Sequence, residues 1–170
     1  MAVLDYSKPR NSNFSAAGQD LFKIMERLLG NQNLLKLLKY SVPNALGKED
    51  LTDEEKAELV NKNIKVIPEI VLPEDNGSVV IVSFDGFIPN DNNPVFRDNV
   101  ITFDVLCYLD TWLMNDYMLR PYKIMHEIDA MFNSSKLNGI GRVDFVSANS
   151  LILSSELAGF TLTYRVINDV

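Results

Sequence analysis

The sequence predicts an α+β fold: a mainly antiparallel sheet of four strands with helices packed on one of its faces. Three observations predict it. Apolar residues recur at helical spacing over 19–40 and again over 121–132, and alternation over 99–109 is typical of a half-buried strand. Short links between the strand segments favour antiparallel pairing. We expect one domain over 19–170, preceded by an extended N-terminal arm over 1–18.

The first predicted helix has the clearest periodicity. Its apolar residues follow the spacing of an amphipathic helix: Leu21, Ile24, Met25, Leu28 and Leu29. A second leucine-rich helical segment follows at 34–38. Thr52 predicts the start of a short, solvated helix, because Glu55 stands three residues later at the spacing of a capping box. Pro121 suits the first turn of the last predicted helix.

The strand predictions rest on β-branched and alternating segments. Four strands are expected over 79–84, 99–109, 142–146 and 159–167. A further edge strand is expected at 64–67 or 69–72, because prolines confine strands to sheet edges. We interpret Asp85-Gly86 and the segment 89–94, rich in Pro, Asn and Asp, as a turn-rich loop between the first two strands.

The segment 1–18 is rich in Ser and Asn and carries isolated apolar residues such as Val3, Tyr6 and Phe14 without period. Two interpretations remain open for this arm. It is either a frayed terminus or an arm that becomes ordered on a neighbouring subunit.

Composition limits the functions that are possible. Lys and Arg number 16 and Asp and Glu number 23, which gives a formal net charge of −7. A sequence-independent DNA-binding protein normally presents a basic surface, so that class is disfavoured.

One cysteine excludes an internal disulfide and suits a reducing cytoplasm. The N-terminal residues lack an apolar signal-peptide core and no run reaches the ~18 apolar residues of a membrane span, so we expect a cytosolic protein without a membrane partner.

No residues form a credible catalytic constellation. Cys107 belongs to the apolar face of the 99–109 strand, where a thiol is expected to be buried and neutral. His126 is the only histidine, and we expect it to pack or lie on the surface of a helix. The G-x-G at 139–141 follows a helix and precedes a strand, the reverse of a phosphate loop. We therefore expect a protein that is not an enzyme, with no catalytic, cofactor-binding or metal-binding residues.

Five residues are candidates for a subunit interface. Phe14 lies in the arm, and Phe87, Ile88, Phe96 and Arg97 lie around the turn-rich loop. One interpretation places the loop residues on a projecting hairpin that docks on a neighbour, where aromatic anchors are effective. The other interpretation is ordinary packing in the core.

The order of segments in the C-terminal half resembles a known family. Two strands within 79–109 precede a helix with the sequence Arg-Pro-Tyr-Lys-Ile-Met-His-Glu-Ile-Asp at 120–129. After the helix comes Leu-Asn-Gly-Ile-Gly at 137–141. The last strand contains Tyr-Arg-Val at 164–166. This arrangement resembles the tail-terminator, or tail-completion, proteins and related neck proteins of long-tailed bacteriophages. The resemblance covers about residues 19–168. The arm and the acidic helix at 51–63 depart from the family's compact members.

The resemblance implies a structural virion protein without catalytic residues. It would be assembled in the host cytoplasm as a hexameric ring that caps the tail tube and meets the head connector or stopper, with DNA passing through the lumen without specific binding. A net charge of −7 per subunit would keep such a lumen from holding DNA. Two alternatives remain: a head–tail adaptor, stopper or other connector component, or a small cytoplasmic binding or regulatory module.

Overall fold

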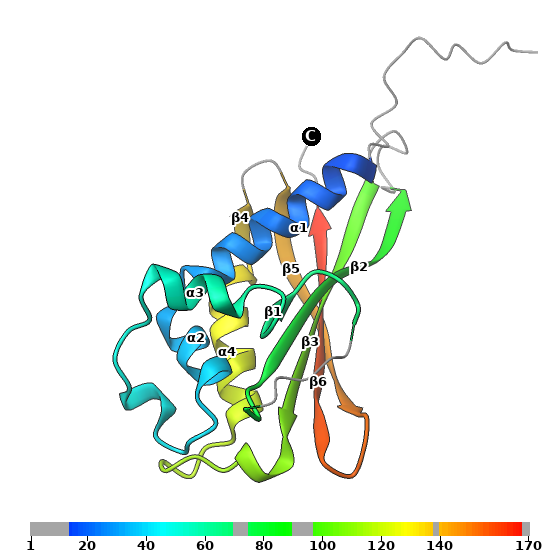
Figure 1. The fold of residues 1–170 in the computed structure, drawn as a ribbon. Coiled ribbons are helices and arrows are strands. Elements are labelled where there is room, and N and C mark those ends of the chain that lie inside the picture. The colour runs from blue at the N-terminus through cyan, green and yellow to red at the C-terminus, as the bar shows by residue number, and fades with distance from the viewer. Residues whose placement is uncertain (1–13, 70–74, 90–96, 138–139, 168–170) are drawn as a thin grey trace, which may run out of the picture.

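The computed structural model describes residues 14–69, 75–89, 97–137 and 140–167, and Figure 1 shows how their elements are arranged. The elements are, in chain order, α1 (Phe14–Leu29), α2 (Gln32–Lys39), the 3-10 turn η1 (Ala45–Gly47), α3 (Asp53–Leu59), β1 (Ile64–Lys65), β2 (Val79–Pro89), β3 (Arg97–Tyr108), the 3-10 turn η2 (Leu109–Thr111), α4 (Arg120–Phe132), β4 (Ser135–Leu137), β5 (Gly141–Ile152) and β6 (Leu157–Ile167).

The described strands form one six-stranded sheet in the order β1-β2-β3-β6-β5-β4. β1 pairs in parallel with β2, and every other neighbouring pair is antiparallel. The α+β class is confirmed, but the expected four antiparallel strands were too few. β1 confirms the edge strand expected at 64–67, although it has only two residues and pairs in parallel with β2. β4 was not predicted, because its three residues are too few for a periodic signal. Figure 1 shows the helices gathered on one side of this sheet.

The main core lies between that face of the sheet and the helices. Phe103 of β3 is central: its ring contacts Phe132 of α4 at 5.0 Å and Tyr164 of β6 at 5.6 Å between centroids. All three side chains are fully buried. The alternation predicted for β3 is therefore confirmed up to Cys107. The assignment of Leu109 to that face was wrong, because β3 ends at Tyr108 and Leu109 begins η2, where it is exposed.

Caps define the ends of the shorter helices. The predicted capping box of α3 is confirmed: the Thr52 hydroxyl accepts a hydrogen bond from the Glu55 amide, and the Glu55 carboxylate accepts one from the Thr52 amide. Asn31 caps α2 with its side-chain oxygen, which accepts a hydrogen bond from the Leu34 amide. α1 begins at Phe14, so the last five residues of the predicted arm are helical. Residues 1–13 lie outside the described residues.

Candidate subunit-interface site

Three phenylalanines meet where the first turn of α1 lies against the far end of β2. The Phe14 ring contacts the Phe87 ring edge-on, at 5.1 Å between centroids, and Phe87 lies 5.4 Å from Phe84. We call Phe14, Phe84 and Phe87 the aromatic patch. Phe14 is 59% exposed and Phe87 36% exposed. The structure therefore brings together two residues, Phe14 and Phe87, that the sequence analysis chose separately.

A β-bulge makes this patch possible. Phe84 pairs with Ile101, but the next paired residue of β2 is Gly86, so Asp85 is an extra residue in the ladder. Strict alternation would place Phe84 and Phe87 on opposite faces, and one extra residue restores both to the same face. The interpretation of Asp85-Gly86 as a turn was therefore wrong. β2 continues to Pro89 and β3 begins at Arg97, and residues 90–96 of the predicted loop lie outside the described residues.

The other predicted interface residues are only partly placed. Ile88 is paired with Asp98, and Pro89 with Arg97, in the backbone ladder of β2 and β3. The side chains of Ile88 and Arg97, and all of Phe96, lie outside the described residues.

A second exposed apolar surface, which was not predicted from the sequence, lies between β3 and α4. We call residues 113–119 the apolar loop. Leu113 is 61% exposed, Met118 48%, and Tyr117 93%. An antiparallel bridge joins Leu113 to Leu119 and closes the loop at its base. Tyr117 has φ 59°, a left-handed conformation that is uncommon for a residue other than glycine.

Hydrogen bonds fix the conformation of the apolar loop. The Met114 amide donates to the Met118 carbonyl at 3.0 Å, and the Tyr117 amide donates to the Met114 carbonyl at 3.2 Å. The Asp116 carboxylate accepts from the Met118 amide and pairs with Lys123 at 2.8 Å. The hydrogen bond and charge of Lys123 lower the pKa of Asp116 below its usual value. The loop is therefore a rigid projection with an aromatic ring at its tip.

Arg120 anchors that projection from inside the protein. Its side chain is fully buried, and it donates to the carbonyl oxygens of Thr111, Leu37, Tyr40 and Val42 at 2.6–2.9 Å. Those acceptors include groups at the end of α2, where unpaired carbonyls favour a cation. Burial lowers the pKa of this guanidinium below its usual value. A fully buried arginine is rare, so sequence reasoning gives no signal for it.

A hollow lies between α4 and β5, and His126 stands at its rim. We call it the α4–β5 hollow; it has a volume of about 270 Å³. Its lining comprises Tyr122, Met125, His126, Asp129, Asn133, Phe145, Ala148 and Leu162. The Tyr164 hydroxyl donates to Asp129 Oδ1 at 3.0 Å. Burial of Tyr164, reinforced by the Asp129 carboxylate, raises the pKa of that phenol.

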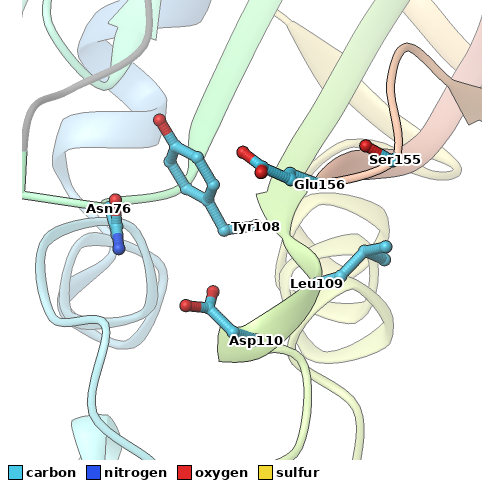
Figure 2. A pocket seen from close by; sticks show the side chains of 6 residues that line it. All are labelled: Asn76, Tyr108, Leu109, Asp110, Ser155 and Glu156. Atoms are coloured by element: carbon cyan, nitrogen blue, oxygen red, sulfur yellow. The ribbon is translucent and has the colours of Figure 1, made fainter.

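Another hollow, of about 440 Å³, opens beside the turn that joins β5 to β6. Figure 2 shows Tyr108 with the carboxylates of Asp110 and Glu156 around it, whereas Leu109 points away from them. These groups mainly present hydrogen-bond acceptors and would suit a cationic side chain. Among the described residues, no group of three or more His, Cys, Asp or Glu side chains lies close enough to hold a metal ion.

Cys107 and His126 occupy very different surroundings. Cys107 is fully buried in β3, and burial raises the pKa of its thiol to about 11. It is therefore a neutral thiol at physiological pH, as the sequence predicted. His126 is exposed on α4. Within the part of the chain that the structure describes, no helix is both long and apolar enough to cross a membrane.

Fold and surface together define a small α+β domain with a closed core and exposed apolar surfaces, among them the aromatic patch and the apolar loop. The YomW family model matches residues 31–166, and the chain belongs to this phage-derived family. The match runs from the cap of α2 almost to the end of β6. It includes the apolar loop and leaves out Phe14 with the rest of α1. A search of curated proteins finds no match.

Proposed function

We propose that this chain is a structural subunit of a phage neck or tail. In this proposal it assembles into a ring, six subunits by resemblance, that caps the tail tube and joins it to the head connector. Membership of a phage-derived family supports the setting. The exposed apolar surfaces support association with other subunits as the activity, rather than chemistry.

The aromatic patch is the observation that carries the proposal. The main core is already closed by fully buried side chains of the helices and the sheet. Phe14 and Phe87 lie outside it and keep 59% and 36% of their surface exposed. Aromatic residues held rigidly at the surface are typical anchors of protein interfaces. Their mutual contact fixes the rings in place before a partner arrives, which lowers the entropy lost on binding.

The distribution of charge supports passage of DNA without binding. α3 presents Asp53, Glu54 and Glu58 to solvent, in a chain whose formal net charge is −7. Repeated around a ring, carboxylates that face the lumen would repel the phosphates of DNA. The exposed side of α3 is the surface that this proposal places nearest the lumen.

Measurement of mass by light scattering, combined with negative-stain imaging, tests the ring. Rings are expected for the wild type, and Phe14→Ser and Phe87→Ser are expected to shift the protein toward smaller species. Ile67→Ser is the matched control, because Ile67 is 61% exposed on the connector after β1 and lies outside the aromatic patch. A monomer at every concentration would contradict the ring and favour an adaptor or stopper that needs its partner.

Retention of DNA on the purified protein at low salt tests the lumen separately. The expected result is weak retention that does not increase as salt is lowered. Tight binding that weakens steeply with salt would show phosphate contacts and would contradict this part of the proposal.

A further inference from the structure

The apolar loop holds the Tyr117 ring almost wholly in solvent, on a backbone in the left-handed conformation. The ring is 93% exposed, and its φ of 59° is a conformation that costs on the order of 1–3 kcal/mol for a non-glycine residue. Such strain persists only where the surroundings impose it, and here the turn bonds and the Asp116–Lys123 pair impose it. A strained, rigid and exposed aromatic tip is a feature to be explained by contact with another molecule.

The α4–β5 hollow has the chemistry that accepts a tyrosine side chain. Tyr122, Met125, Phe145 and Leu162 provide apolar and aromatic walls, and Met125 can make a favourable sulfur–aromatic contact. Asp129 provides a polar group: Oδ1 accepts from Tyr164, and Oδ2 retains acceptor capacity. A tyrosine has the same division, with an apolar ring and a polar tip.

The size and openness of the hollow allow a side chain to enter it from outside. It has a volume of about 270 Å³ and is open to solvent on one side.

We propose that the apolar loop of one copy of this chain inserts Tyr117 into the α4–β5 hollow of a second copy. The chain does not fill its own hollow, because Tyr117 is almost fully exposed and its loop is held by hydrogen bonds. The apolar loop and the α4–β5 hollow belong to the same chain, so each copy can insert its own Tyr117 and can accept the Tyr117 of another copy. The inference rests on the proposed function only in taking self-association as the activity, and it adds a joint distinct from the aromatic patch.

Two substitutions remove opposite halves of this joint. Tyr117→Ser removes the ring, and Ala148→Trp fills the hollow from an exposed position on β5. Each is expected to raise the dissociation constant for self-association roughly tenfold or more, as for an interface hot spot. Ser150→Trp is the matched control for bulk, because Ser150 is exposed on the same strand and does not line the hollow. Urea unfolding of each variant checks that the fold is kept.

Mixing the two variants gives the sharpest result. Each variant alone lacks one half of the joint, but a mixture restores one intact joint between a copy with an intact loop and a copy with an intact hollow. With Phe14→Ser and Phe87→Ser added to both variants to remove the aromatic patch, sedimentation velocity should therefore detect one-to-one pairs in the mixture that neither variant forms alone. Unchanged association of both single variants, or a mixture without pairs, would overturn the proposal.

A cross-linking experiment separates this inference from the ring. A photoreactive benzoylphenylalanine in place of Tyr117 should label Met125, Phe145 or other lining residues of a second copy, as mapped by mass spectrometry. Rings without this cross-link would overturn the inference and leave the proposed function standing. Dimers with this cross-link but no rings would support the inference and contradict the ring. A monomer without the cross-link would overturn both.

Discussion

The guanidinium of Arg120 donates a 2.9 Å hydrogen bond to the carbonyl oxygen of Leu37, 83 residues earlier in the chain. The same nitrogen donates to Tyr40, and Nη2 donates to Val42. One buried side chain thus joins the end of α2 to the start of α4. No carboxylate contributes to these hydrogen bonds, so carbonyl dipoles stabilise the charge.

Replacement of Arg120 by methionine should lower the free energy of unfolding by roughly 3–5 kcal/mol, because several buried carbonyl oxygens would lose their donor. Urea denaturation measures this change. Arg142→Met is the control: Arg142 is exposed and pairs with Asp144 at 3.0 Å, so its loss should cost less than about 1 kcal/mol. Equal effects of the two substitutions would contradict the anchoring role of Arg120.

Gly159 and Gly18 should respond to alanine with opposite signs. Gly159 pairs with Leu106 in the centre of the sheet, and a Cβ there would overlap the carbonyl oxygen of Val105. Gly159→Ala should therefore cost at least about 2 kcal/mol. A Cβ on Gly18 in α1 meets nothing within 4 Å, so Gly18→Ala should stabilise by about 0.5–1 kcal/mol. Thermal unfolding of both variants measures the difference in stability. An unchanged stability of Gly159→Ala would show that β3 and β6 can move apart at little cost in free energy.

Burial of Cys107 predicts a dependence of stability on alkaline pH. Burial raises the pKa of this thiol to about 11, above its value near 9 in an unfolded chain. The unfolded state therefore loses its proton first, and stability that is fully present below about pH 9 is lost as pH rises toward 11. The loss should reach up to roughly 2–3 kcal/mol, and Cys107→Ala should remove that part of the pH dependence. Urea unfolding at pH 8, 9 and 10 compares the two proteins, and identical slopes would contradict the prediction.

The edge-on contact of Phe14 and Phe87 should appear as an energetic coupling within one chain. A double-mutant cycle with Phe14→Ala and Phe87→Ala is expected to give a coupling of about 0.5–1 kcal/mol in the free energy of unfolding. The same cycle with Phe22→Ala in place of Phe14→Ala is the control, since Phe22 is exposed on α1 whereas the rings in contact with Phe87 are those of Phe14 and Phe84. Equal coupling in both cycles would mean that α1 does not dock through Phe14.

Local patterns predicted the elements whose causes are local. The stripe of α1, the capping box of Thr52 and Glu55, and the alternation of β3 all depend on residues close in sequence, and each is present. β4 was not predicted because its three residues carry no periodic pattern of their own and are defined by pairing with residues 141–143 of β5.

The parts of the site that sequence could not predict depend on partners far away. Arg120 is buried only because carbonyl oxygens some 80 residues earlier surround it. The aromatic patch depends on an extra residue, Asp85, whose dipeptide with Gly86 is typical of a turn. Tyr117 could not be singled out from the sequence, because its left-handed conformation and the Leu113–Leu119 bridge have no signature in composition.

The position of β6 has a consequence for how the protein is made. β6 is the last strand in the described chain, yet it lies in the middle of the sheet, between β3 and β5. While a ribosome is still adding residues 157–167, β3 and β5 have no common neighbour, and the sheet cannot close. Pairing across more than 50 residues is also slow to form. A nascent chain therefore exposes two strand edges until its final strand emerges, and this is the stage at which we expect it to be most prone to aggregation.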